Sequence, residues 1–369
     1  MTSSSAEVSA AVSPVTKGFE RLLIVRLGSM GDIIHTLPAA LALRQTFPDA
    51  FLGWVVEERW AELLCATSEP RSGAVSPRRP IVNHVHAVNT KEWRHSLTSV
   101  QTWERIAAAL SELRGQNYEM AVDFQGAVRS AVLAKWSGAP LVYGFRQPRE
   151  NVSSMWYTHQ VEAAGTHIIE QNLSLAEAVA QQSLDIPKVE FPGDAAAGTK
   201  IDHWLQSRHI THFVLLNPGA GWGAKQWPAE RFGQVAKLLA KNRLQSLINF
   251  GPEEEPLARA AESASQGAAQ AVGCSLAELI ALTSRAQLVI GGDTGPMHLA
   301  AALRIPVVAI FGPTDPARNG PFGTRSRVLR STSSLTSLSH RAEPDMGLME
   351  ISVDQVAAAA QQLLGESNG

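Results

Sequence analysis

Three glycine-rich segments of the sequence follow apolar runs and hold side chains that could bind or activate a phosphorylated substrate. Residues 25–32 end in Asp32, residues 217–228 combine glycines with Lys225, and residues 288–298 combine glycines with polar side chains. A glycine-rich turn that leads into a helix presents free backbone N–H groups to an anion. A lysine adds a point charge, and an aspartate can accept a proton from a substrate hydroxyl. The three segments therefore favour a site for a phosphate group or a nucleotide.

These segments also have a purely structural interpretation. Ser29 and Asp32 have the spacing of a capping box, and Asp293 and Thr294 are residue types that often cap helices. A fourth segment, residues 251–255, places carboxylates after an apolar run. Such carboxylates could bind the two hydroxyls of a ribose, or they could only favour the N-terminus of the next helix. The residue types alone leave both interpretations open.

A dinucleotide-binding fingerprint is a second functional interpretation of the segment 25–32. Glu57 and Glu58 stand at the end of the next apolar run, where such a site carries its ribose-binding acid. The fingerprint also needs a second glycine that lets the pyrophosphate approach the backbone, and Met30 occupies that position. The sequence therefore disfavours an NAD-dependent dehydrogenase.

The elements that must position these side chains form two similar series. Short apolar runs alternate with amphipathic stretches in both halves of the chain, and this alternation predicts parallel sheets covered by helices on both faces. Strands are predicted at 22–27, 51–56, 84–88, 120–123, 141–143, 213–217, 246–250, 288–291 and 307–311. Helices are predicted at 33–46, 102–113, 128–136, 229–241, 256–265, 276–284, 297–303 and 353–364.

Prolines and glycines interrupt the periodicity near the middle of the chain, where we expect a linker between two α/β domains. The last predicted helix, 353–364, is a candidate to pack back on the N-terminal domain. The expected divisions are a disordered tail at 1–18, an N-terminal domain at 19–186, a linker at 187–200 and a C-terminal domain at 201–369, with loops at 68–80 and 331–347.

Composition narrows the class of protein. The chain has 369 residues, a formal net charge of −2 and 45% hydrophobic residues, which is enough to bury two cores. The nearly neutral charge argues against a protein that coats nucleic acid. Its two cysteines, Cys65 and Cys274, are too few for a disulfide scaffold or a cysteine-rich zinc module. Since no segment matches a signal peptide or a membrane span, we expect a soluble cytoplasmic protein.

The order of the motifs resembles one known family, the glycosyltransferase family 9 heptosyltransferases. The resemblance runs from about Arg21 to Phe322, and it implies the GT-B fold, in which two Rossmann-like domains face each other across a central cleft. The motifs that carry it are Ser29-Met30-Gly31-Asp32 with residues 33–38, Trp54-Val55-Val56-Glu57-Glu58, Asp123-Phe124-Gln125-Gly126, Asp293-Thr294-Gly295 with His298, and Phe311-Gly312-Pro313-Thr314-Asp315-Pro316.

The resemblance implies a role for each residue that matches the family's pattern. Asp32 matches the catalytic aspartate, the general base that deprotonates the acceptor hydroxyl. Lys225 and a helix N-terminus would stabilise the negative charge of the departing ADP. Glu255, or Glu254 if the alignment shifts by one residue, matches the acid that binds ribose. The expected donor-binding residues are Ser29, Gly31, Gly219, Ala220, Gly221, Lys225, Glu254, Glu255, Asp293, Thr294, Gly295 and His298.

Basic side chains of the N-terminal domain match the family's acceptor site. The expected acceptor-binding residues are Lys91, Arg94, His95 and Arg149. Residues 124–149 contain arginine and lysine but no acid, and a surface of one sign suits an anionic lipid head group. An ordinary basic surface would have the same composition. Glu92 and His95 depart from the pattern, because the family carries basic residues at both positions.

The resemblance implies an inverting single displacement, with ADP-L-glycero-D-manno-heptose as donor and Kdo₂-lipid A as acceptor. The members that act on the first Kdo (3-deoxy-octulosonate) are those the chain resembles most. We expect a monomer at the cytoplasmic face of the inner membrane that binds no nucleic acid. No metal or other cofactor is expected, because the histidines show no close pair joined to acids. The alternatives are another acceptor or nucleotide sugar, or a catalytically silent nucleotide-sugar binder, against which the joint presence of Asp32 and Lys225 argues.

Overall fold

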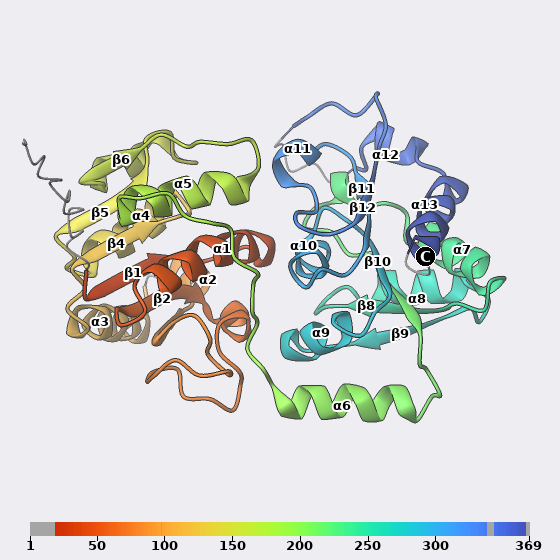
Figure 1. Cartoon of the computed structure of the whole chain (residues 1–369), viewed down its shortest axis with the longest axis horizontal. Helices are drawn as coiled ribbons and strands as arrows, with labels where there is room; N and C mark the ends of the chain where they lie inside the picture. The colour runs from red at the N-terminus through yellow and green to blue at the C-terminus, as the bar shows by residue number, and fades with distance from the viewer. Residues whose placement is uncertain (1–18, 97, 338–342, 367–369) are drawn as a thin grey trace, which may run out of the picture.

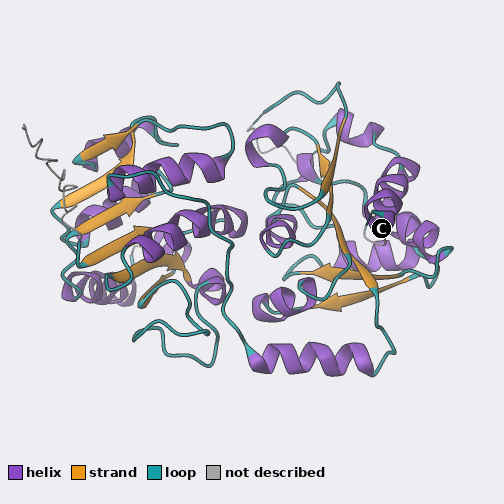
Figure 2. Ribbon diagram, in the orientation of Figure 1, coloured by secondary structure: helices purple, strands orange, loops and turns teal. Residues whose placement is uncertain are grey.

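The computed structural model of the chain describes residues 19–96, 98–337 and 343–366. The tail expected at 1–18 and part of the loop expected at 331–347 lie outside these residues. Two bodies lie side by side, each a sheet with helices on both faces, which confirms the predicted fold class of two α/β domains with parallel sheets (Figures 1 and 2).

The first sheet has six parallel strands in the order β3-β2-β1-β4-β5-β6. Its central strands are apolar and buried because helices cover both of their faces. The strands are β1 (Arg21–Val25), β2 (Phe51–Glu57), β3 (His84–Val88), β4 (Met120–Asp123), β5 (Leu141–Phe145) and β6 (His159–Val161). The helices are α1 (Met30–Thr46), α2 (Thr90–His95), α3 (Val100–Gly115), α4 (Val128–Trp136) and α5 (Ile168–Ala180), with 3₁₀ turns η1 (Glu58–Leu63) and η2 (Asn151–Trp156).

The second sheet also has six parallel strands, in the order β12-β11-β10-β7-β8-β9. They are β7 (Phe213–Asn217), β8 (Gln245–Phe250), β9 (Ala269–Gly273), β10 (Leu288–Gly292), β11 (Val307–Phe311) and β12 (Ser326–Arg330). The helices are α6 (Ala195–Gln206), α7 (Ala229–Ala240), α8 (Glu255–Ala264), α9 (Leu276–Thr283), α10 (Gly295–Ala302), α11 (Pro316–Asn319), α12 (Met346–Glu350) and α13 (Val353–Gly365), with the 3₁₀ turn η3 (Gly223–Lys225).

Both sheets have the same strand order when each is counted along the chain, 3-2-1-4-5-6. In this order the direction of winding reverses between the first and the fourth strand, and ligands of such sheets bind outside the carboxyl ends of those two strands. The reversal falls between β1 and β4 in the first sheet and between β7 and β10 in the second. Three of the four glycine-rich or acidic segments found in the sequence follow β1, β7 and β10.

The two domains meet through α1 and α10, which lie side by side (Figure 1). A continuous apolar cluster runs from the first sheet through α1 into the second domain, including Ile24, Leu37 and Met297. Because the sheet covers one side of α1 and the second domain covers another, nearly every residue from Met30 to Arg44 is buried. The expectation of a plainly amphipathic helix therefore does not apply to α1.

Three expectations about the chain's organisation need correction. The last helix, α13, packs on α7 and on the second sheet, so it does not pack back on the N-terminal domain. The segment 187–200 is not wholly a linker, since Asp194 caps α6 and the helix begins at Ala195. The edge strands β6, β9 and β12 and the helices α2, α5, α6, α11 and α12 were not predicted.

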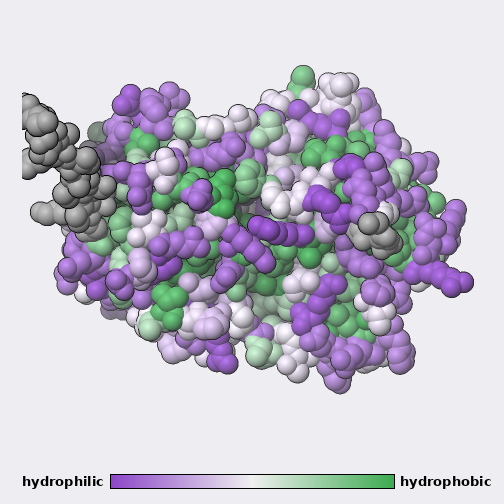
Figure 3. Space-filling view, viewed as in Figure 1, coloured by the Kyte–Doolittle hydropathy of each residue, from purple (hydrophilic) through white to green (hydrophobic). Residues whose placement is uncertain are grey.

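Among the residues that the structure describes, no helix combines the length and the apolar character needed to cross a membrane. On the face drawn in Figure 3, apolar side chains show in several separate groups among polar ones.

Candidate active site

Asp32 lies at the third position of α1, directly after the turn that ends β1. The Ser29 backbone N–H and hydroxyl donate hydrogen bonds to Asp32 Oδ2 at 2.9 and 3.1 Å. Arg26 Nη2 lies 2.8 Å from Asp32 Oδ1. The predicted capping interaction thus exists, but the Asp32 side chain is still 35% exposed. A carboxylate oxygen has two lone pairs, so Asp32 can accept a further proton from a bound molecule.

The charge state of Asp32 is set by opposing effects. Burial raises the pKa of Asp32, but the Arg26 guanidinium, the two groups of Ser29 and the more distant Arg149 outweigh it, and the net pKa is below the ordinary value. Asp32 is therefore ionised at neutral pH. It can act as a base, although a weak one.

Arg26 is a site residue to which the sequence interpretation gave no role. It is 6% exposed at the end of β1, and its Nη1 donates to the carbonyl oxygen of Phe124. The Trp54 indole donates to the Arg26 carbonyl at 3.1 Å. The available signal was an arginine at the end of an otherwise apolar strand, since such a charge is buried only when it is paired.

The segment after β4 holds Arg26 in place. Asp123 is fully buried, and its carboxylate accepts hydrogen bonds from the Gln125 and Gly126 backbones and from the hydroxyls of Ser130 and Tyr157. Burial raises the pKa of Asp123 despite these bonds. The Asp123 motif therefore shapes the loop that presents the Phe124 carbonyl to the arginine.

Basic side chains near Asp32 act electrostatically on one another. Burial lowers the pKa of Arg129; Glu57 raises it, and Arg94 and Arg149 lower it again. Two of the four expected acceptor residues, Arg94 and Arg149, therefore lie within electrostatic range of Arg129, and Arg149 also lies within range of Asp32. Arg149 is held by the turn at Gly126, where an added Cβ would lie 2.9 Å from the Arg149 nitrogen.

The two departures from the family pattern lie on α2. Glu92 pairs with Arg105 of α3 and accepts a hydrogen bond from the Asn89 side chain at 3.2 Å, so its charge is used within the domain. Lys91 and His95 are exposed on the same short helix. The structure gives neither of them a contact with the three arginines.

The expected donor-binding residues of the second domain centre on Asp293. Lys225 Nζ lies 2.5 Å from Asp293 Oδ2 and 4.1 Å from the centre of the Trp222 ring. His298 Nε2 lies 3.0 Å from Asp293 Oδ1. Burial raises the pKa of Asp293, but the hydrogen bond from His298 and the charge of Lys225 outweigh it, so the pKa lies well below its usual range. Asp293 is therefore ionised and neutralises Lys225.

The loops after β7 and β8 settle which acidic residue faces the glycine segment. Glu254 accepts a hydrogen bond from the Gly251 backbone at 2.9 Å, and a Cβ added to Gly219 would lie 2.2 Å from Glu254 Oε1. Glu255 instead pairs with Arg259 on the surface of α8. The geometry therefore favours Glu254 over Glu255 as a group that faces the donor segment. Ala220 is half-buried and Gly221 is exposed in the same loop.

Two of the expected donor-binding glycines lie at the domain contact. A Cβ added to Gly31 would lie 2.6 Å from the His298 ring, and one added to Gly295 would lie 2.5 Å from Met30 Sδ. Glycine at both positions lets the first turns of α1 and α10 approach closely. Thr294 precedes α10 as its N-cap residue. A role for these glycines in donor binding stays a prediction.

A histidine pair connects the two domains, and the sequence gave no local signal for it. His35 Nε2 of α1 lies 3.0 Å from His298 Nδ1 of α10. His298 also contacts Asp293, so hydrogen bonds run from α1 to Lys225. Burial lowers the pKa of His35 far below the ordinary value, with further contributions from His298 and His167. Both histidines border an interdomain cavity of about 260 Å³.

We expect the free energy of unfolding to fall as the pH is lowered below about 6.5. In the folded protein the pKa of His35 is depressed, and burial also lowers that of His86 and His167. Between the unfolded and folded pKa values the unfolded chain binds protons that the folded chain does not, so ΔG of unfolding decreases by at most about 1.4 kcal/mol per pH unit for each histidine.

Urea unfolding between pH 5 and 8 measures this slope. His35→Gln keeps a hydrogen-bond donor towards His298 but does not titrate, and we expect it to reduce the slope. His203→Gln, on the exposed face of α6, is the control. An equal slope in the His35→Gln variant and in the parent would contradict the prediction.

The expectation that no histidines lie close together beside an acid is wrong. His84, His86 and Glu112 form such a group on the far edge of the first sheet. The sequence signal was the spacing of two residues within one predicted strand, which places both side chains on one face.

Comparisons with known proteins agree with these motifs. The model of glycosyltransferase family 9 (heptosyltransferase) matches residues 106–345. The chain is 30% identical to lipopolysaccharide heptosyltransferase 1 of Pseudomonas aeruginosa over 316 residues, 84% of this chain and 82% of that protein. It is 27% identical to lipopolysaccharide heptosyltransferase 3 of Escherichia coli, over 91% of this chain and 96% of that protein.

Solved structures show the same architecture. E. coli heptosyltransferase WaaC with ADP superposes with a TM-score of 0.73 at 26% identity, covering 93% of this chain and 99% of that one. E. coli ADP-heptose lps heptosyltransferase II superposes with a TM-score of 0.72 at 20% identity, which shows the fold alone. These structures confirm the expected GT-B arrangement of two domains. The family model covers more than half of the sequence, and the chain belongs to glycosyltransferase family 9, the heptosyltransferases.

Proposed function

We propose that the protein transfers heptose from ADP-L-glycero-D-manno-heptose to the first Kdo of Kdo₂-lipid A, as a heptosyltransferase of type I. The observation that carries this proposal is the ionised Asp32 carboxylate, which Arg26 holds by an ion pair and on which Arg149 also acts. The relatives named lipopolysaccharide heptosyltransferase 1 support the choice of reaction.

In the proposed reaction the acceptor hydroxyl attacks the anomeric carbon of heptose from the face opposite ADP. The new bond joins this carbon to the acceptor oxygen, the bond to the β-phosphate oxygen breaks, and Asp32 takes the hydroxyl proton. Configuration at the anomeric carbon inverts. Since the pKa of Asp32 is low, proton transfer to it is favourable only when the acceptor oxygen is already forming its bond.

The second domain supports the donor half of the proposal. The departing ADP gains negative charge, and Lys225 together with the N-terminus of α10 would stabilise that charge. Glu254 lies where it could accept hydrogen bonds from ribose hydroxyls. Two solved structures of E. coli WaaC hold ADP and ADP-2-deoxy-2-fluoro heptose, which supports the same donor class here.

The proposed acceptor follows from the positive charge of the arginines in the N-terminal domain. Kdo carries a carboxylate and lipid A carries phosphates, and arginine binds both groups through paired N–H donors. Arg94, Arg129 and Arg149 would face the head group, with the protein bound as a monomer at the cytoplasmic face of the inner membrane.

A second candidate differs only in the acceptor. Lipopolysaccharide heptosyltransferase 3 of E. coli matches over a larger share of this chain than the heptosyltransferase 1 of P. aeruginosa, although at lower identity. An enzyme of this kind would use the same donor groups and would add heptose to a core sugar.

The experiment that separates the candidates is a transfer assay with purified protein and ADP-heptose. Kdo₂-lipid A and a heptosylated core oligosaccharide are offered separately, and products are identified by mass. Transfer to Kdo₂-lipid A alone supports the proposal. Transfer to the heptosylated core alone supports the second candidate, and hydrolysis of ADP-heptose without transfer to either acceptor contradicts both.

We expect Arg149→Gln to raise the KM for Kdo₂-lipid A by about tenfold, because it loses a charge-assisted hydrogen bond to an anionic acceptor. The KM for ADP-heptose should stay unchanged. Arg146→Gln is the matched control, since Arg146 pairs with Glu162 at 3.1 Å. Equal acceptor KM values in the two variants would remove Arg149 from the acceptor site.

A further inference from the structure

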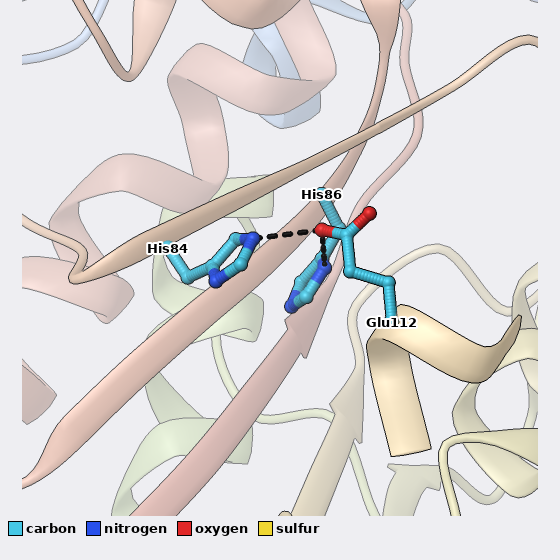
Figure 4. A group of neighbouring side chains, drawn as sticks. All are labelled: His84, His86 and Glu112. Carbon is cyan, nitrogen blue, oxygen red and sulfur yellow. Dashed lines mark hydrogen bonds and ion pairs between the residues drawn. The ribbon is translucent and has the colours of Figure 1, made fainter. Parts of the chain in front are cut away.

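The edge of the first sheet carries a group of side chains that the transfer reaction does not use. His84 and His86 come from β3 and Glu112 from α3 (Figure 4). His84 Nε2 lies 2.7 Å and His86 Nδ1 lies 2.9 Å from the same oxygen, Glu112 Oε1. Within the described part of the chain this is the one group of three or more histidine, cysteine or acidic residues with metal-ligand spacing.

The strand geometry explains why two imidazoles point to one oxygen. Residues two apart on a strand lie on the same face, and the rings of His84 and His86 stack with centres 4.0 Å apart at 11°. The carboxylate reaches them from the neighbouring helix. Two nitrogens and one oxygen thus converge from two elements, as the protein ligands of a zinc site do.

One further contact distinguishes this group from a simple surface ion pair. His86 Nε2 lies 2.7 Å from the hydroxyl of Tyr118, which is 3% exposed and packs over Gly53. Metal-binding histidines usually hold a second partner of this kind on the other ring nitrogen. His84 lacks such a partner, because its Nδ1 is buried without a hydrogen bond.

The site is closed on one side and open on the other. The two histidines are 8% and 3% exposed, whereas the Glu112 side chain is 50% exposed. An ion can therefore enter past the carboxylate, and water can complete the coordination. A tetrahedral zinc ion would separate its ligand atoms by about 3.3 Å, so Glu112 needs to move outward by only a few tenths of an ångström from its present 2.7 and 2.9 Å.

We propose that His84, His86 and Glu112 bind one divalent transition-metal ion of the zinc class, which fastens α3 to the edge strand β3. Little of this helix is buried, since Thr102 and Leu113 are its only buried residues. Residues 89–99 connect β3 to α3 and include α2, which carries Lys91 and Arg94. On the proposed function, the ion would therefore also steady the segment that faces the acceptor.

Metal binding is tested without any activity measurement. The full chain is treated with a chelator and titrated with Zn²⁺ by calorimetry, and Co²⁺ is added separately to record the visible absorption of a tetrahedral site. We expect one ion per chain, and thermal unfolding at a higher temperature with Zn²⁺ than with chelator. A parent chain that binds no ion at one equivalent would overturn the proposal.

Variants locate the site. His84→Ala/His86→Ala should abolish binding, and Glu112→Gln, which keeps the shape of the side chain, should weaken it by at least about 100-fold. Tyr118→Phe should weaken it by about 10–100-fold, the usual effect of losing a partner of a metal ligand. His203→Ala/His212→Ala removes two exposed histidines of the second domain and should bind as the parent does.

If the first double variant and Glu112→Gln bind Zn²⁺ as tightly as the parent, the ion lies elsewhere and the proposal is wrong. The transfer assay is run separately with and without chelator. Its failure with every acceptor would contradict the proposed function and leave the metal result intact, because calorimetry does not depend on substrate.

Discussion

Asp32→Asn is expected to lower kcat for heptosyl transfer by about 10²–10⁴-fold, the usual contribution of a general base, and to leave ADP affinity unchanged. Asparagine keeps an oxygen towards Arg26 but cannot accept the acceptor proton. Initial rates with saturating donor and acceptor measure the effect, and calorimetry with ADP measures donor binding. Asp49→Asn, an exposed aspartate beyond the other end of α1, is the control.

The pH profile of the parent enzyme separates catalysis from a structural role. The net pKa of Asp32 is low, so the acid limb of kcat/KM should lie below the ordinary range of a carboxylate. Arg26→Gln removes the largest stabilising charge on Asp32, and we expect it to move that limb to higher pH. A profile that stays in place in this variant, or an Asp32→Asn enzyme with the parent's rate, would remove Asp32 as the base.

The sequence could predict the central part of both sheets because those strands are buried on both faces. β1, β2, β7, β10 and β11 are continuous apolar runs. The edge strands β6, β9 and β12 are covered on fewer sides. Their polar or small residues are types that also occur in loops. The helix α6 was hidden for a similar reason, because its first residues are small and follow Pro192 and Gly193.

The residues of the candidate site also fall into those that the sequence could pair and those that it could not. Residues within one segment, such as Ser29 with Asp32, could be paired from their spacing. His35 and His298 are 263 residues apart, and nothing local to either one indicates the other. The choice between Glu254 and Glu255 likewise depends on which side of α8 each faces, and only the packing of Gly219 decides it. Long-range contacts of single side chains leave no periodic pattern in a sequence.

Two single substitutions on the donor side are expected to change the affinity for ADP in opposite directions. Lys225 is 11% exposed and already paired with Asp293, which is 5% exposed. A diphosphate must therefore compete with Asp293 for the lysine and also approach a carboxylate of like charge. The affinity measured for ADP is the difference between these interactions, and each side chain can be removed separately.

We expect Lys225→Met to weaken ADP binding by about 10–100-fold, the value of a charge-assisted hydrogen bond, and Asp293→Asn to tighten it. Lys225→Met also leaves a buried carboxylate without its cation, so its free energy of unfolding should fall, by up to about 3–5 kcal/mol. The double variant removes both charges and should recover part of that stability while ADP binding stays weak.

Calorimetry with ADP and urea unfolding of the four proteins complete a double-mutant cycle. ADP is the probe because it lacks the sugar, so any contact of Asp293 with heptose does not enter the result. Unchanged affinity in Lys225→Met would exclude Lys225 from the phosphate site. Weaker binding in Asp293→Asn would mean that this aspartate positions Lys225 for the phosphate, and that the ion pair prepares the site for the donor and does not compete with it.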